Sequence, residues 1–389
     1  MWFSRKIGPF LEGITSSFPA VILTGGRQVG KTSLFTKLFP AHTFVTLDLP
    51  SHAELAEKQP EEFLRRYPPP VVIDEVQYAP GLFRYLKVWI DKNRTTYGQF
   101  LLTGSQKFTL MNNVSESLAG RCAVVELETL SLDEVQSQIP ITSLQMILRG
   151  GFPELHQRPE LDHRIFYQSY LATYLERDVR TLLSVVHLRD FERFLRACAL
   201  RNAQLLNKAD LARDIGISPP TANQWLSVLN ASNQIQFLEP WFRNGTKSLV
   251  KSPKLYFSDT GLLCFLLGIT TEDELLRSPL LGSIWESFVF SEIRKKMIAE
   301  RGRWDLWFWR DLRGLEADFL IHHGGNFELI EAKLSEMPGP RDVNALNKVA
   351  ETLGHKNVQK KTVICQTSHS YPIDNNIMAM NLEEFHKLC

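Results

Sequence analysis

The sequence contains little cysteine, and its cysteines are scattered. Five occur in 389 residues, at positions 122, 198, 264, 365 and 389. Because no two of them form a CxxC pair, the sequence predicts neither a zinc ribbon nor a framework of disulfides. Unpaired thiols are typical of proteins in a reducing compartment, so we expect a cytoplasmic protein.

A charge imbalance and long apolar runs are missing as well. Lysine plus arginine number 44 and aspartate plus glutamate 43, a net charge of +1, so any surface for nucleic acid has to be a local patch. The longest apolar run, residues 262–269, is far shorter than the roughly 20 residues that cross a bilayer. The first ten residues, MWFSRKIGPF, lack the apolar core of a signal peptide. We therefore expect no membrane partner.

The remaining composition, 44% hydrophobic and 22% charged, is that of a soluble globular protein. A chain of 389 residues exceeds what one hydrophobic core usually organises, so two or three domains are expected.

Residues 20–39, AVILTGGRQVGKTSLFTKLF, combine an apolar β-rich run, a glycine-rich loop and a helical pattern. The loop matches GxxxxGK[ST], in which glycines let backbone N–H groups surround phosphate oxygens and the following helix adds its positive end. Lys31 is expected to reach the β- and γ-phosphates of a nucleotide, and the Thr32 hydroxyl to ligate Mg²⁺. The predicted nucleotide-binding residues here are Gly25, Gly26, Arg27, Gln28, Val29, Gly30, Lys31, Thr32 and Ser33.

A second strand is predicted at residues 44–49. Two further strands follow it, and each of these ends in polar residues. Residues 71–73 are apolar throughout, as in a parallel sheet buried on both faces, and two acids come next. Asp74 is placed to hold the water shell of Mg²⁺ and Glu75 to polarise the attacking water, although two acids can also simply cap a strand. The strand within residues 99–108 ends where a sensor of the γ-phosphate is expected, with an ordinary turn as the alternative. Its polar end consists of Thr103, Gly104 and Ser105.

A single arginine and a helical segment come next. Arg121 precedes another strand and is predicted either to reach the nucleotide of a neighbouring subunit or to pair with an acid. Residues 131–190 have a helical pattern, which we interpret as a lid or linker. One apolar stripe within it consists of Tyr170, Leu171, Tyr174 and Leu175.

Residues 207–232 predict a helix-turn-helix. The first helix stops at Gly216, and the second has Ser218 as its N-cap and Pro219 as its first residue. The exposed face predicted for the second helix has no lysine or arginine and consists of Thr221, Asn223, Gln224 and Ser227.

Two strands joined by a turn are predicted after the helix-turn-helix and would form a wing. Positive charge is concentrated there, which favours contacts with DNA phosphates over recognition of base sequence. The alternative is that the wing packs against neighbouring domains. The basic residues of the predicted wing are Arg243, Lys247, Lys251 and Lys254.

Residues 327–334, FELIEAKL, alternate like a strand and place Glu331 and Lys333 on one face. Asp318 lies on the strand before the preceding turn, and Glu286 lies near the start of an upstream helix. Acids so arranged can form a metal site with the lysine beside it. A surface ion pair on an inactive domain is the alternative.

Five segments, LTGGRQVGKTSL, VVIDEVQ, LLTGSQ, SLAGR and GGFPEL, resemble in this order a prokaryotic family of AAA-type P-loop ATPases with a C-terminal domain of unknown function. The C-terminal acids and lysine resemble the PD-(D/E)xK nuclease core, although Ala317 stands where a proline is expected. The resemblance implies an α/β fold with a P-loop ATPase core on a parallel sheet (1–130), a helical lid (131–190), a winged helix (191–258) and a restriction-endonuclease-like domain (259–389). It also implies ATP and Mg²⁺ as cofactors and a homo-oligomer, for example a hexamer.

The sequence thus predicts a Mg-dependent AAA-type ATPase coupled to DNA binding and to cleavage or remodelling of DNA. The alternative is a nucleotide-dependent regulatory or scaffolding switch with an inactive nuclease-like domain. The predicted catalytic residues are Lys31, Glu75, Arg121 and Lys333. The predicted metal ligands are Thr32, Asp74, Glu286, Asp318 and Glu331.

Overall fold

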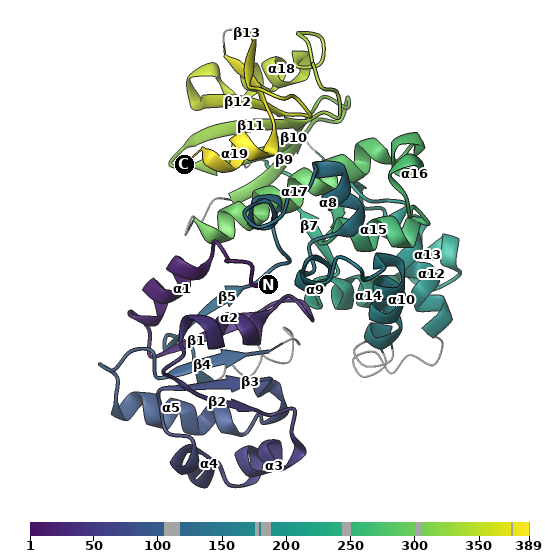
Figure 1. Ribbon diagram of the computed structural model, residues 1–389. Coiled ribbons are helices and arrows are strands. Elements are labelled where there is room, and N and C mark those ends of the chain that lie inside the picture. The colour runs from purple at the N-terminus through teal and green to yellow at the C-terminus, as the bar shows by residue number, and fades with distance from the viewer. Residues whose placement is uncertain are drawn as a thin grey trace.

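The computed structural model describes residues 1–104, 117–175, 179, 188–242, 250–300, 305–374 and 376–388. Figure 1 shows a sheet with helices at the N-terminal end, a mostly helical middle segment, and a second large sheet at the C-terminal end. Helix α17 (Leu281–Ala299) lies between these three parts. Among the described residues, no helix combines the length and apolar character that crossing a bilayer requires.

The N-terminal sheet has five parallel strands in the order β2-β3-β4-β1-β5. The predicted burial of residues 71–73 on both faces is confirmed, since all of β3 is buried. The strands are β1 (Ala20–Thr24), β2 (Thr43–Thr46), β3 (Val71–Asp74), β4 (Phe100–Thr103) and β5 (Cys122–Glu126). The helices around them are α1 (Gly8–Thr15), α2 (Lys31–Leu38), α3 (Pro50–Lys58), α4 (Pro60–Arg66), η1 (Val76–Tyr78) and α5 (Leu82–Lys92).

The middle segment begins with short helices. The predicted apolar stripe on α10 is confirmed, because its residues are at most 7% exposed. Three rings of α10, those of Phe166, Tyr167 and Tyr170, pack against Phe152. Phe152 is the N-cap residue of α9. The helices are α7 (Leu132–Gln136), α8 (Ser143–Arg149), α9 (Pro153–Gln157), α10 (His163–Tyr174) and α12 (Leu188–Ala199).

Two helices with the predicted caps follow. Helix α13 (Lys208–Ile215) ends at Gly216, whose φ of 79° is favourable only for glycine. Helix α14 (Pro219–Ala231) is capped by the Ser218 side chain, which accepts from the Thr221 N–H. The polar face of α14 is largely exposed, as predicted.

A small antiparallel sheet completes the middle segment, in the order β6-β8-β7. Its strands are β6 (Gln204–Leu205), β7 (Ile235–Leu238) and β8 (Lys254–Phe257). The prediction that Lys254 contributes to a basic exposed wing was wrong: its side chain is 3% exposed and is surrounded by carboxylates. All four residues of β8 are buried, so Lys254 is enclosed with the rest of its strand, whereas Lys251 lies before the strand and is exposed. Arg243 and Lys247 lie outside the described residues.

The C-terminal sheet has the order β13-β14-β12-β11-β10-β9. The predicted hairpin is confirmed, since β10 and β11 pair antiparallel across the Gly324–Gly325 turn. The strands are β9 (Asp305–Arg310), β10 (Glu316–His323), β11 (Asn326–Ala332), β12 (Val358–Ile364), β13 (Tyr371–Asp374) and β14 (Ile377–Met380). The helices from residue 260 onward are α15 (Thr260–Leu267), α16 (Glu272–Arg277), α17, α18 (Asn344–Leu353), η3 (His355–Asn357) and α19 (Leu382–Lys387).

Helix α17 is apolar over most of its circumference, which is typical of a helix enclosed by protein. Its buried side chains belong to one hydrophobic core that also contains residues of the N-terminal sheet and of the middle helices. They include Ile284, Trp285, Phe288, Val289 and Ile293. A single core therefore holds the three parts of the chain together.

Candidate functional sites

The phosphate-binding loop joins β1 to α2 and needs glycine at two positions. Gly25 has a φ of 139°, and a Cβ there would lie 2.1 Å from the Leu127 carbonyl oxygen. Gly30 has a φ of 93° and immediately precedes α2. Lys31 is 6% exposed, and its Nζ donates to the carbonyl oxygens of Gly25 (3.0 Å) and Gly26 (2.6 Å). The lysine is thus folded over the loop that it is predicted to serve.

Asp74 gathers hydroxyl groups from three other elements. Its Oδ1 accepts from the hydroxyls of Thr32 (2.6 Å) and Thr103 (2.5 Å), and its Oδ2 from that of Thr46 (3.3 Å). The predicted magnesium pair, Thr32 and Asp74, therefore lies together. Thr46 was missed, although it ends β2 in the parallel sheet and the carboxyl ends of such strands share an edge.

Glu75 has the left-handed backbone conformation, with φ 55° and ψ 45°. This conformation is rare for residues with a Cβ and costs on the order of 1–3 kcal/mol. Here it directs the Glu75 N–H to the Thr103 hydroxyl (3.1 Å), and the Gln77 side chain donates to the Glu75 carboxylate. The acid is thus held in place at the strand end.

A cavity of about 550 Å³ lies beside the loop, a volume in the usual range for small-molecule sites. Its wall includes the predicted residues Arg27, Gln28, Val29, Gly30, Lys31, Thr32, Ser33 and Glu75. Sequence patterns did not reveal the opposite wall, which comes from the N-terminus and from α9 and α10. That wall includes Trp2, Phe3, Arg5, Glu154, Gln157, Tyr170 and Thr173.

Two predicted residues lie outside this arrangement. Arg121 donates to both carboxylate oxygens of Asp91, at 2.7 and 2.9 Å, so pairing with an acid is the contact made within the chain. Its role toward a neighbouring nucleotide stays a prediction. Ser105 lies outside the described residues.

A second polar site, the acidic site, contains Glu286, Glu316, Asp318, Glu331 and Lys333. Its predicted members lie near one another: the Lys333 ammonium donates to Glu331 Oε1 (2.8 Å), and Asp318 Oδ2 accepts from the N–H of Ala332, next to Glu331 (2.9 Å).

Glu286 Oε1 accepts from the Lys254 ammonium (2.8 Å) and from the Tyr256 hydroxyl (2.5 Å). Lys254 also pairs with Glu316 and lies 3.9 Å from Asp318 Oδ1. No sequence pattern indicates this position of Lys254, because the lysine comes from a strand of a different sheet.

Burial raises the pKa of carboxyl groups in the acidic site. The pKa of Glu331 rises from 4.5 to about 8, through burial and the charge of Asp318, despite the opposing effect of Lys333. The pKa of Glu286 rises to about 7, again through burial and the charge of Asp318, with Lys254 opposing. The acidic site therefore has less positive charge than its carboxylates need for full ionisation.

One further observation indicates that the acidic site can accept a divalent cation. Glu331 is 6% exposed, and its Oε2 is a buried acceptor without a hydrogen-bond donor. Carboxylate oxygens are the ligands that Mg²⁺ prefers. Asp318 and Glu331 are therefore able to hold such an ion, and Lys333 to stand beside it as a non-ligand.

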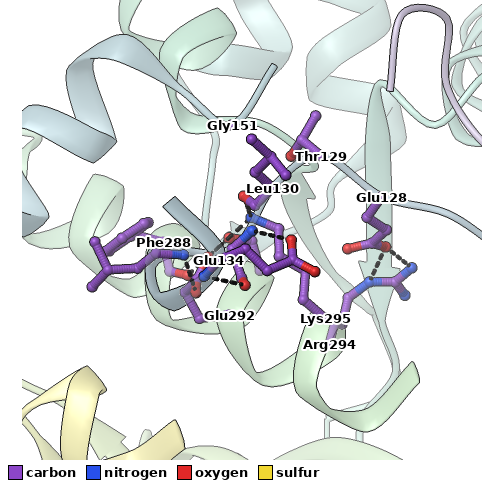
Figure 2. A network of polar contacts seen from close by, with 12 residues as sticks. Glu128, Thr129, Leu130, Glu134, Gly151, Phe288, Glu292, Arg294 and Lys295 are labelled. Carbon is purple, nitrogen blue, oxygen red and sulfur yellow. Dashed lines mark hydrogen bonds and ion pairs between the residues drawn. The ribbon is translucent and has the colours of Figure 1, made fainter. Parts of the chain in front are cut away.

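A third group of contacts, the polar network, joins the N-terminal sheet to α17 (Figure 2). Glu128 accepts from Arg294 Nε (3.0 Å), Lys295 Nζ donates to the Leu130 carbonyl (2.9 Å), and the Leu132 N–H donates to Glu292 Oε2 (2.9 Å). Each contact joins residues 128–132 to one turn of α17.

Arg5 extends the polar network to the phosphate-binding loop. It donates to the carbonyl oxygens of Val29 (3.0 Å) and Glu128 (2.7 Å), and to the Glu134 carboxylate (3.1 Å). Figure 2 places Glu134 beside the contacts with α17. An uninterrupted series of hydrogen bonds therefore runs from the loop to α17, the helix that carries Glu286.

Comparison with known proteins divides the chain into three regions. Residues 17–136 match the model of an AAA domain, which supports the P-loop assignment. Residues 142–273 and 281–385 match two domains of unknown function, DUF8612 and DUF4143.

The chain has relatives of similar length. It is 31% identical over 370 residues to uncharacterized proteins of Mycobacterium tuberculosis and Mycobacterium bovis, covering 94% of this chain and 80% of each relative.

Similarity to solved structures is more distant. The Walker-type ATPase PABY2304 of Pyrococcus abyssi is 17% identical with a TM-score of 0.47, over 68% of this chain and 96% of that one. The RuvB Holliday junction branch migration motor of Thermotoga maritima is 14% identical with a TM-score of 0.30, over 59% and 88%.

The raised pKa values predict how stability depends on pH when no metal is present. A carboxyl group whose pKa is higher in the folded chain stabilises the fold fully below its unfolded pKa, and this contribution is lost as pH rises through the folded value. In EDTA, the free energy of unfolding should therefore fall as pH rises from about 4.5 and should level off above about 8. Urea unfolding across this range measures the change.

Glu331→Gln should remove the part of this decline that Glu331 causes, because an amide does not titrate. Glu328→Gln is the matched control, since Glu328 lies on the same strand but alternates to the other face. An unchanged pH dependence in Glu331→Gln would contradict the raised pKa.

Proposed function

The chain belongs to the same family as the two mycobacterial proteins and carries an AAA domain, and we propose that it binds Mg-ATP at the phosphate-binding loop and hydrolyses it. One observation carries this proposal: Thr32, Asp74 and Thr103 converge by hydrogen bonds of 2.5 to 2.6 Å at the strand edge next to Lys31. A hydroxyl and a carboxylate are the groups that P-loop proteins use for the magnesium ion.

Lys31 is positioned to exchange partners when nucleotide binds. Its present acceptors are neutral carbonyl oxygens, and a charged phosphate is a stronger acceptor for an ammonium group. Phosphate in the loop would therefore draw Lys31 from the Gly25 and Gly26 carbonyls. The bound Mg²⁺ supplies charge neutralisation at the β- and γ-oxygens.

Glu75 is the residue proposed to orient the attacking water. It lines the cavity, and its backbone and carboxylate are both fixed by hydrogen bonds, to Thr103 and from Gln77. A carboxylate in a fixed position can accept a proton from water without first being ordered. Arg121 acting on a neighbouring subunit's nucleotide in a homo-oligomer remains part of the proposal.

The remaining domains are proposed to act on DNA. The capped helices α13 and α14 with the small sheet support a winged helix, and the exposed Lys251 is one group that could contact phosphate. The acidic site supports metal-dependent cleavage of phosphodiesters, with Asp318 and Glu331 holding the ion and Lys333 orienting water.

The polar network favours a second candidate function, a nucleotide-dependent switch. Arg5 contacts the loop at Val29 and the segment that holds α17, and α17 carries Glu286 of the acidic site. A shift of the loop on nucleotide binding would alter these buried, charge-assisted contacts. ATP would then control the C-terminal domain whether or not that domain cleaves DNA.

The first test of the proposal concerns nucleotide. Lys31→Ala should reduce ATP binding below detection in calorimetry, because it removes the charge that faces the phosphates. Glu75→Gln should keep ATP binding and lose turnover, since the amide cannot accept a proton from water. Wild-type turnover in Glu75→Gln would show that another group orients the water.

The second test concerns the acidic site. In an Asp74→Ala background, which removes the carboxylate proposed to hold metal at the nucleotide site, Asp318→Ala should lose Mn²⁺ binding in a calorimetric titration and any DNA nicking. Lys333→Ala should keep Mn²⁺ and lose only nicking, because an ammonium group is not a metal ligand. Equal Mn²⁺ binding by the parent and Asp318→Ala would remove the metal assignment.

The third test concerns the switch. In a Glu75→Gln background, ATP should slow backbone hydrogen exchange in α17, because the polar network transmits the change at the loop. Arg294→Met should lose this effect while it keeps ATP affinity. Arg277→Met, which changes an exposed arginine on α16, is the control. If Arg294→Met responds to ATP like its parent, the polar network does not couple the sites.

A further inference from the structure

Lys254 reaches the acidic site from a different sheet. It is the first residue of β8, whose hydrogen-bonded neighbours are β6 and β7 of the middle segment. Its carboxylate partners belong to α17 and β10. The acidic site is therefore assembled only when the small sheet is docked against the C-terminal part.

The Lys254 ammonium lies among carboxylate oxygens of the acidic site, where a metal ion would also be attracted. It lies 2.8 Å from Glu286 Oε1 and 3.9 Å from Asp318 Oδ1, and it pairs with Glu316. The other Asp318 oxygen already accepts the Ala332 N–H. Glu331 Oε2 is a buried oxygen of this site without a hydrogen-bond donor.

Backbone hydrogen bonds join β9 to the segment that precedes β8. The Trp241 N–H donates to the Phe308 carbonyl (2.7 Å), the Phe308 N–H to the Glu239 carbonyl (3.2 Å), and the Val250 N–H to the Arg310 carbonyl (3.2 Å). All three join β9 to residues that precede β8 in the chain, at positions 239, 241 and 250. The residues bonded to β9 therefore belong to the segment of the chain that leads to Lys254.

We propose that Lys254 is a tethered cation that competes with a divalent metal ion for the acidic site. A monovalent ammonium at the Asp318 and Glu286 oxygens repels a second cation and removes acceptor capacity from it. Metal binding should therefore be weaker with the Lys254 ammonium present than without it. This inference rests on the proposed metal role of Asp318 and Glu331.

A purely structural ion pair predicts the opposite result. If Lys254 only ties the small sheet to the C-terminal part, its removal leaves buried acids unpaired and loosens the site. Metal affinity would then be unchanged or lower. Competition predicts higher affinity, so the sign of the change distinguishes the two roles.

The test is Mn²⁺ binding to the full chain, measured by calorimetry and by the electron paramagnetic resonance signal of free Mn²⁺. All variants carry Asp74→Ala, which removes the carboxylate proposed to hold metal at the nucleotide site, so that this site contributes no metal. Lys254→Met should bind Mn²⁺ at least about tenfold more tightly than its parent, because the competing charge is gone. Lys348→Met, which changes an exposed lysine on α18, should match the parent.

Two further variants protect the test against misfolding. Lys254→Gln loses the charge but can still donate to Glu286, so it should show the same gain. Lys254→Arg keeps the charge and should bind Mn²⁺ like the parent. Circular dichroism melting of each variant establishes that it is folded.

The outcomes separate this inference from the proposed function. Binding to the parent with no gain in either Lys254→Met or Lys254→Gln would overturn the competition and leave the metal site intact. Binding by neither the parent nor the two neutral variants would overturn both. A gain that Asp318→Ala abolishes supports both.

Discussion

The packing of α17 against α7 and α19 depends on the buried carboxylate of Glu292. It is fully buried, and it accepts from the Leu132 N–H, the Lys295 ammonium and the His386 ring, each at 2.9 Å. Burial alone would raise its pKa, but the charge of Lys295 and these hydrogen bonds hold that pKa at about 2. An ionised carboxylate at this position fixes α17 to α7 and α19 at once.

The two candidate sites solve the placement of negative charge in different ways. Asp74 is one carboxylate among hydroxyl groups, which stabilise its charge without cancelling it and leave it able to attract magnesium. The acidic site crowds several carboxylates around one internal ammonium. The carboxylate of Asp74 has no cation paired with it among these contacts. In the acidic site, the balance of charge depends on the position of Lys254.

The position of α17 relates these sites to one another. Its C-terminal half receives the polar network from the segment next to the phosphate-binding loop (Figure 2). Its N-terminal half carries Glu286 of the acidic site. The phosphate-binding loop and the acidic site are thus both connected to α17, although they are far apart in the sequence.

The sequence by itself determined the features that depend on neighbouring residues. The glycines at 25 and 30, the Ser218 cap, and the alternation that places Glu331 and Lys333 on one face are local patterns with local physical causes. Thr32 and Asp74 were also correctly paired, because the rule for carboxyl ends of parallel strands reaches beyond one element.

The tertiary structure alone decided the contacts that depend on how sheets and helices dock. No periodicity could place Lys254 among acids some 30 to 60 residues further along the chain, bring Arg5 to Val29 and Glu134, or bury Glu292 beside His386. Each of these charges is tolerated in the interior because an opposite charge or hydrogen-bonding groups compensate it, and at least one of these partners comes from a distant element. Such pairs are set by the packing of the whole core, and a local pattern carries no record of them.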